Sequence, residues 1–235
     1  MSRAWRSRTA RKALLSAGIA AVGVYVVGDL LSGLLYEGYS FKDQWISELT
    51  ARGSPVRPLM LGVMTVHRLL VAAFGVGIWR SAGRSRSLRW VGPLLIVSSI
   101  VGFFTYVVFP MTSRWMESSF SDTMHGILSL VWSLLVFAAV ILSAMAYRGW
   151  FRRYSIATLL VLIGFGTASS TAIRGIEENL TPWAGGFERI IAYAFFAWLV
   201  VLAVTVMRRS LTHVAPGKGE TEVAQTREPL LVARS

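Results

Sequence analysis

The chain has 235 residues, of which 54% are hydrophobic and only 15% are charged. Soluble domains carry about a quarter charged residues, so this composition excludes an ordinary soluble domain and predicts an integral membrane protein. The net charge of +12 would suit a nucleic-acid-binding protein, but the Lys and Arg residues interrupt apolar runs instead of gathering on one polar surface, so no nucleic-acid partner is expected. The absence of cysteine excludes disulfides, thiolate metal ligands and cysteine nucleophiles.

Six apolar runs are long enough to cross a bilayer, whose hydrocarbon core of about 30 Å requires about 20 helical residues. Lipid offers no partners to backbone N–H and C=O groups, so each run is expected to be a helix. Prolines, Pro93 among them, are expected at or beyond the helix ends. The predicted fold class is therefore all-α, a polytopic bundle of six transmembrane helices. The runs are 13–35, 58–79, 91–109, 125–147, 155–173 and 187–207.

The basic residues fall on one side of these predicted helices. Segments 1–12, 80–90, 148–153 and 208–209 carry Arg and Lys but no acidic residue, whereas the alternate connections hold most of the acidic residues. The positive-inside rule places the first set in the cytoplasm, so both termini are expected inside and the alternate connections outside a plasma membrane. The high Arg and Ala content indicates a bacterium with a GC-rich genome.

Three regions follow from this arrangement. Residues 1–12 form a basic cytoplasmic segment, residues 13–209 form the transmembrane domain, and residues 210–235, which lack hydrophobic periodicity, form a disordered cytoplasmic tail. Within the domain, small residues recur four positions apart and predict close packing of helices. The pairs are Ala17/Ala21, Gly28/Ser32, Ala73/Gly77, Ser98/Gly102, Ser129/Ser133, Gly164/Ala168 and Gly166/Ser170.

The first outward connection contains Phe41, Trp45 and Leu49, which are four residues apart. This spacing predicts a short helix with one apolar face. Two interpretations of it remain open. In the first, the helix lies at the membrane interface with its charges in water. In the second, the helix points Ser47 and Glu48 into an outward-facing ligand pocket.

Asp122 and His125 begin the fourth predicted helix and lie three residues apart, so they are neighbours on one helix face. A carboxylate beside an imidazole orients the ring and raises its basicity, as a general base requires. An acidic residue in the first turn is also what the helix dipole favours without any catalytic role, so both interpretations stay open. No metal ligand and no cofactor is assigned. A zinc site is disfavoured because only His67 and His125 lie in the membrane region and there are no thiolates, whereas a carboxylate-rich metal site stays open.

Further charged residues lie in the third outward connection and at the start of the sixth predicted helix. Arg174 and Glu177 have the spacing of an intrahelical ion pair, which in water contributes only about 0–1 kcal/mol. Glu188 and Arg189 begin the sixth helix. If the helices pack into a closed bundle, His125, Glu177 and Glu188 are expected to lie around one outward-facing opening.

Asp29, His67 and Arg68 lie deeper inside the predicted helices. An ionisable group at the centre of the bilayer costs at least about 2.5–3.5 kcal/mol, so each of these side chains should face the bundle interior and have a partner. We expect Asp29 to pair with Arg68, and His67 to bridge toward a polar cavity. A structural ion pair and a buried ligand or proton site are both consistent with this pattern.

Four short motifs together resemble the pattern of a bacterial membrane-protein family catalogued as a domain of unknown function, number 998. The resemblance covers residues 13–207. It implies a six-helix bundle with polar residues near the outer face and brings no substrate or mechanism, and it does not include the pair His67-Arg68. The motifs are Trp45-Ile46-Ser47-Glu48-Leu49-Thr50, Phe109-Pro110, His125-Gly126 and Glu188-Arg189.

The leading functional hypothesis is an outward-opening polar pocket that binds a small molecule or a lipid headgroup, with membrane lipids as further partners. Its lining candidates are Ser47, Glu48, Asp122, His125, Arg174, Glu177, Glu188 and Arg189. One alternative is a membrane-embedded hydrolase with His125 as general base beside Asp122. A second is a small-solute transporter with Asp29, His67 and Arg68 at its inner site. A third is a structural or assembly protein, and the oligomeric state is not predicted.

Overall fold

The computed structural model describes residues 3–112, 118–172 and 181–212. Within these ranges the chain forms six long helices, one 3₁₀-helix, one π-helix and no strand. Each long helix is long and apolar enough to cross a membrane, which confirms the predicted all-α, six-helix membrane fold. The long helices are α1 (Arg3–Leu35), α2 (Arg57–Ser81), α3 (Arg86–Phe103), α4 (Phe120–Ala146), α5 (Trp150–Ala172) and α6 (Ala184–Thr212).

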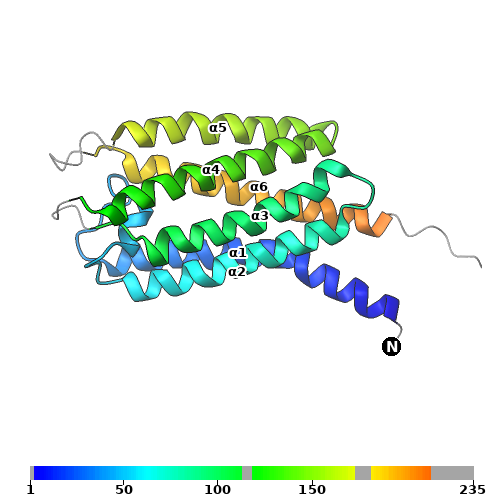
Figure 1. The fold of residues 1–235 in the computed structure, drawn as a ribbon, viewed down its shortest axis with the longest axis horizontal. Helices are drawn as coiled ribbons and strands as arrows, with labels where there is room; N and C mark the ends of the chain where they lie inside the picture. The colour runs from blue at the N-terminus through cyan, green and yellow to red at the C-terminus, as the bar shows by residue number, and fades with distance from the viewer. Residues whose placement is uncertain (1–2, 113–117, 173–180, 213–235) are drawn as a thin grey trace, which may run out of the picture.

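The two ends of the bundle differ in their connections. Figure 1 shows that α1 begins and α6 ends on the same side. We call this side the basic end, and it also holds the turns between α2 and α3 and between α4 and α5. We call the opposite side the acidic end, and it holds the connection between α1 and α2 and the starts of α4 and α6. Of the predicted tail, residues 213–235 lie outside the described residues.

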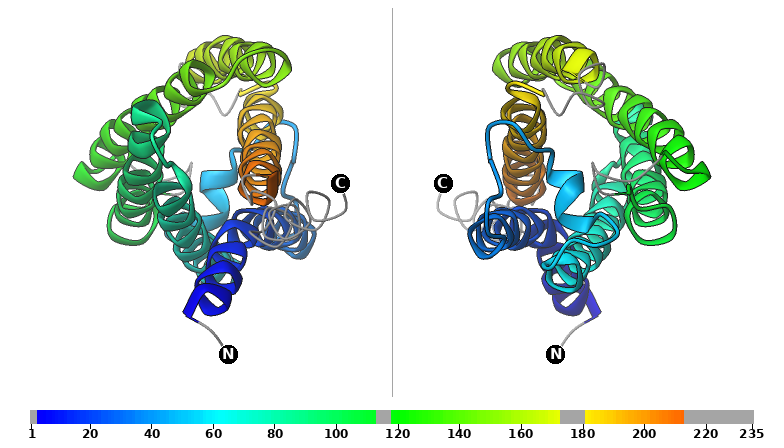
Figure 2. Two further views of the ribbon diagram at one scale, coloured as in Figure 1. Left: turned by 90° about the vertical axis from the view of Figure 1, so that its right-hand side faces the viewer. Right: turned by 90° about the vertical axis from the view of Figure 1, so that its left-hand side faces the viewer.

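The helices follow one another around a ring, which Figure 2 shows end-on. Neighbours in the chain are neighbours in space, and α6 closes the ring by packing against α1 as well as α5. Phe74 of α2, Leu95 of α3 and Trp198 of α6 are fully buried between the helices. Leucines also cover the outer surface, and Leu69 and Leu160 are about two-thirds exposed. An apolar exterior around an apolar interior is expected where lipid surrounds the protein.

Close backbone approaches account for part of the predicted small-residue pattern. A Cβ atom on Gly92 of α3 would lie 2.5 Å from the carbonyl oxygen of Gly75 of α2, so these helices touch through their backbones. Gly28 also allows a close approach, here to the Val63 side chain, as its pair with Ser32 predicted. By contrast, Gly164 and Gly166 of α5 have nothing within 4 Å of an added Cβ. The prediction that these two glycines mediate packing is therefore wrong for the described part of the chain.

Proline placement differs from the expectation at one residue. Pro93 lies inside α3 rather than at its end. The reason is that Ser85 caps the helix, since its hydroxyl accepts a hydrogen bond from the Leu88 N–H at 3.3 Å, and so sets the start of α3 at Arg86.

The connection between α1 and α2 enters the ring instead of lying on it. Its 3₁₀-helix η1 (Ile46–Thr50) is buried over its whole length, and Ile46, Leu49 and Thr50 have no exposed surface. Figure 2 shows this segment inside the ring at the acidic end. The predicted interfacial helix with one apolar face is therefore wrong. Apolar residues point to more than one side of so short a helix, so only an interior position buries them all.

Candidate functional site

Asp29 of α1 forms a buried ion pair with Arg189 of α6. The Arg189 Nη2 and Nε atoms donate to the two carboxylate oxygens of Asp29 at 2.8 and 3.1 Å, and Asp29 has no exposed surface. The predicted pairing of Asp29 with Arg68 is therefore wrong. The physical reason is that α6 packs directly against α1 and offers a guanidinium in the two-pronged geometry that best fits a carboxylate.

The other donors of Arg189 hold the connection between α1 and α2. Its Nη1 atom donates to the carbonyls of Phe41 and Gln44 at 2.8 and 3.3 Å, and its Nη2 atom donates to the Tyr39 hydroxyl at 2.9 Å. Burial raises the pKa of the Tyr39 phenol well above its ordinary value, although Arg189 opposes the shift. The phenol therefore stays protonated and donates to the Trp45 carbonyl at 2.8 Å. One guanidinium thus neutralises a buried charge and fixes the segment that leads into η1.

The start of α6 binds the same connection through further polar contacts. The Glu188 carboxylate accepts a hydrogen bond from the Ile46 N–H, which is the first amide of η1. The Asp43 carboxylate accepts from the Trp183 N–H at 3.0 Å. Burial alone would raise the pKa of Asp43, but its hydrogen bonds from Trp183 and Ser40 outweigh that effect and hold the pKa below its ordinary value. The carboxylate therefore stays ionised near neutral pH and keeps the two segments together.

Ser47 and Glu48 lie within η1, close to the start of α6. Glu48 is 6% exposed, and its carboxylate accepts from the Trp45 N–H at 2.9 Å and from the Gln44 side chain at 3.2 Å. Ser47 is also buried, and its carbonyl accepts from the Thr50 hydroxyl at 2.8 Å. The structure therefore brings Ser47 and Glu48 into one region with Glu188 and Arg189, but their hydrogen bonds stabilise η1.

Asp122 caps the start of α4. Its carboxylate accepts from the Ser119 N–H at 2.8 Å and from the Ser119 hydroxyl at 2.7 Å, which is a capping arrangement. It also accepts from the N–H and hydroxyl of Thr112 at 2.8 and 3.0 Å. The carboxylate is therefore occupied by the chain that enters α4.

His125 contacts the end of α3 rather than Asp122. Its Nδ1 atom lies 3.0 Å from the Thr105 carbonyl and 2.9 Å from the Phe109 carbonyl, and because carbonyls only accept, Nδ1 carries the proton. The Thr105 carbonyl is available because α3 ends in the π-helix η2 (Phe104–Val108), where the residue five positions after Thr105 is Pro110, which has no N–H. Of the two interpretations left open for Asp122 and His125, these contacts favour the one in which Asp122 serves the start of the helix and does not orient the imidazole.

Arg68 of α2 is buried without an acidic partner in the described part of the chain. It is 7% exposed, and its Nε atom has no hydrogen-bond partner. Its guanidinium lies 5.6 Å from the ring centre of Tyr106 and 5.3 Å from that of Trp132. Gly102 of α3 makes room for it, because a Cβ there would lie 2.6 Å from the Arg68 Nε atom. Among the described residues, this guanidinium contacts aromatic rings.

His67 and two tyrosines complete the surroundings of Arg68. The His67 Nδ1 atom donates to the Ala21 carbonyl at 3.0 Å, and its ring lies edge-on to Tyr25 at 4.9 Å. The phenols of Tyr25 and Tyr106 interact electrostatically with both Arg68 and Glu188. The sequence reading missed Tyr25, Tyr106 and Trp132, because aromatic residues inside apolar runs are typical of a hydrophobic core. We call Tyr25, His67, Arg68, Tyr106 and Trp132 the Arg68 cluster.

Two predicted lining residues, Arg174 and Glu177, lie outside the described residues, so the predicted convergence of Glu177 with His125 and Glu188 stays a prediction. Among the residues that are described, no three His, Asp or Glu side chains form a group that would hold a metal ion.

Comparison with known protein families shows the family to which the chain belongs. A family model described as "Protein of unknown function (DUF998)" matches residues 19–205. No curated protein matches the chain. No solved structure matches it either.

Proposed function

Because the chain belongs to the DUF998 family, whose function is not known, we propose its function from the geometry, namely that the bundle binds an anionic group at Arg68. The group is a carboxylate or a phosphate, carried by a small molecule or by a lipid headgroup. The observation that carries this proposal is the burial of Arg68 without a counter-ion among the described residues.

The depth of Arg68 makes an unmatched charge expensive. Arg68 lies eleven residues after the start of α2 at Arg57, which corresponds to a depth of about 16 Å from the acidic end. A lone cation near mid-membrane costs at least about 2.5–3.5 kcal/mol, and such residues usually pair or mark a functional site. Asp29, the buried acid of α1, is already neutralised by Arg189. A bound anion would supply the missing charge.

The aromatic neighbours of Arg68 favour an anion in the plane of its guanidinium. Ring faces attract the cation, as the Tyr106 and Trp132 contacts show. They offer no strong acceptor to the five N–H groups, which point outward in the guanidinium plane. Carboxylate and phosphate oxygens fit this planar fork with two parallel hydrogen bonds. The His67 ring and the two phenols are the further polar groups around such a ligand.

The alternatives receive less support from the same geometry. A hydrolase with His125 as general base would need Asp122 to orient the imidazole, and Asp122 instead accepts hydrogen bonds from Ser119 and Thr112. A transporter with Asp29 at an inner site would need that carboxylate to be available, and it is engaged with Arg189 and Tyr193.

Native mass spectrometry tests the proposal. Protein purified from its membrane in mild detergent is expected to retain a bound species, whose mass distinguishes a phospholipid from a small organic or inorganic anion. Arg68→Met is expected to lose this species. The matched variant Arg52→Met, which removes an exposed arginine at the acidic end of the bundle, is expected to keep it. Equal retention by both variants would contradict the proposal.

The stability of the ligand-free protein separates binding from a purely structural role. In protein stripped of bound species, Arg68→Met is expected to unfold at the same temperature as the parent chain or higher, because an apolar isostere replaces an unmatched buried charge. If the main role of Arg68 were to pack against aromatic rings, the unfolding temperature of the same variant would be several degrees lower than that of the parent chain. That result would count against a ligand site even if the variant lost the bound species.

We also propose that the chain lies in a plasma membrane with the basic end in the cytoplasm, on the basis of the positive-inside pattern. The chain has no cysteine, so single cysteines can be labelled without background. Glu37→Cys at the acidic end is expected to react with a membrane-impermeant maleimide on intact cells, and Arg84→Cys at the basic end is expected to react only after lysis. The reverse pattern would overturn this orientation.

A further inference from the structure

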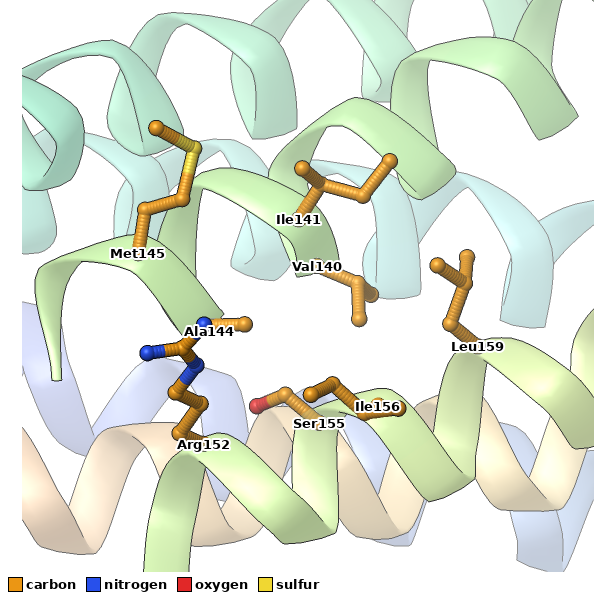
Figure 3. Close-up of a pocket in the computed structure, with 8 residues that line it drawn as sticks. All are labelled: Val140, Ile141, Ala144, Met145, Arg152, Ser155, Ile156 and Leu159. Atoms are coloured by element: carbon orange, nitrogen blue, oxygen red, sulfur yellow. The ribbon is translucent and has the colours of Figure 1, made fainter. Parts of the chain in front are cut away.

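A groove lies between α4 and α5 near the basic end of the bundle, and Figure 3 shows its lining. It encloses a cavity of about 190 Å³. Val140 and Ser155 lie at its floor and have no exposed surface, whereas Ile141, Met145 and Ile156 at its rim are 44%, 67% and 45% exposed. The groove therefore combines a buried floor with apolar walls that open outward.

The occupant of this groove has to be apolar over most of its length. The lining residues up to Met145 lie in the membrane span of α4, and those from Arg152 onward lie in that of α5. The Ser155 hydroxyl at the floor accepts a hydrogen bond from the Trp198 indole at 3.2 Å, so it already has a partner. Helix α5 is also the least buried span, with 17% of its most apolar 18-residue stretch buried against 39% for that of α6. An unfilled gap beside it would forfeit dispersion contacts, which an acyl chain restores.

The end of the groove carries a positive charge at the level of the lipid headgroups. Arg152 lines the groove two residues after α5 begins at Trp150. Trp150 is 60% exposed and stacks on Tyr154, with ring centres 5.3 Å apart. Trp and Tyr side chains near a helix end mark the membrane interface. An arginine at that level binds a phosphate group with two hydrogen bonds.

We propose that this groove is a binding site for an anionic phospholipid, whose acyl chain lies between α4 and α5 and whose phosphate contacts Arg152. The charge complementarity at one end and the apolar walls along the rest select an amphiphile over a soluble anion. This site is independent of the anion site proposed at Arg68, since Arg68 lies near the middle of α2 and does not line the groove.

Lipid titration followed by native mass spectrometry tests the site. Purified protein in detergent is offered phosphatidylglycerol or phosphatidylcholine, and the parent chain is expected to retain phosphatidylglycerol preferentially. Arg152→Gln is expected to reduce that preference about fivefold, the effect of one arginine near an anionic headgroup. The adjacent variant Arg153→Gln, which removes a charge that does not line the groove, is expected to preserve it. Equal effects of the two variants would reduce the site to general attraction by the basic end and overturn the proposal.

A second variant tests the acyl-chain part of the site. Ile156→Trp fills the groove from its exposed rim without removing a charge, and it is expected to lower the retention of both lipids. Unchanged retention of phosphatidylglycerol in this variant would place the acyl chain elsewhere and overturn the proposal. Arg68→Met is expected to leave the lipid preference unchanged, so failure at one site is distinguishable from failure at the other.

Discussion

Replacing Asp29 with leucine is expected to lower the free energy of unfolding by about 3–5 kcal/mol, because the Arg189 guanidinium would remain buried without its counter-ion. Asp29 accepts two hydrogen bonds from Arg189 and a third from the Tyr193 hydroxyl at 2.6 Å. Titration with sodium dodecyl sulfate in mixed micelles, followed by tryptophan fluorescence, measures the loss.

Two further variants separate the charge from the hydrogen bonds at this ion pair. Tyr193→Phe removes one hydrogen bond to the same carboxylate and is expected to cost only about 1 kcal/mol. The double variant Asp29→Leu with Arg189→Met removes both charges, and it is expected to recover most of the stability that the single Asp29 variant loses. Similar losses for Asp29→Leu and Tyr193→Phe would contradict the role assigned to the ion pair.

Gly185→Ala is expected to cost about 3 kcal/mol, at the upper end of the range for overpacking. A Cβ atom at Gly185 would collide with the carbonyl oxygen of Gln44 and would lie 2.7 Å from that of Phe41. Both oxygens also accept hydrogen bonds from Arg189. The methyl group would therefore push the connection between α1 and α2 away from α6 and weaken the Arg189 contacts at the same time. Thermal unfolding in detergent measures the effect.

The neighbouring glycine supplies the control for this substitution. A Cβ at Gly186 would meet the Trp183 ring at 3.2 Å and the Lys42 carbonyl at 3.7 Å, which small shifts accommodate. Gly186→Ala is therefore expected to change stability little, with the higher helix propensity of alanine offsetting the tighter contact. Equal destabilisation by the two variants would show that the close approach at Gly185 does not hold η1 in place.

The membrane spans could be predicted from the sequence because length and hydropathy are local properties. The predicted runs agree with the observed membrane spans to within five residues at every end, and at α3 and α4 a cap decides where the helix starts. Ser85 begins α3 at Arg86 and so places Pro93 inside the helix. Ser119 together with Asp122 begins α4 at Phe120.

The partners of the buried charges could not be predicted in the same way. Arg68 and Arg189 were both available to Asp29, and the choice depends on which helix packs beside α1 at that depth. Spacing correctly placed Asp122 and His125 on one side of α4, but it does not indicate which backbone groups compete for them. Because Pro110 has no N–H, the Thr105 carbonyl lacks a backbone partner, and the His125 imidazole donates to it. The motif Phe109-Pro110 was the signal in the sequence that could have indicated this contact.

The polar residues of the bundle thus fall into two groups with different energetics. Around Arg189, charges and hydrogen bonds are matched, and the result is a fixed segment inside the acidic end of the ring. Around Arg68, a buried cation faces aromatic rings and lacks an acidic partner in the described ranges. The first group stabilises the fold, and the second is where we place the binding of an anion.

The most direct test of the Arg68 cluster is an experimental density map of the protein, purified in mild detergent from its own membrane. We expect non-protein density with oxygen atoms about 2.7–3.2 Å from the Arg68 guanidinium nitrogens, and loss of that density in Arg68→Met. A map in which every N–H group of Arg68 is hydrogen-bonded to protein side chains, for instance to the Glu188 carboxylate, with no additional density beside it, would contradict the proposed anion site.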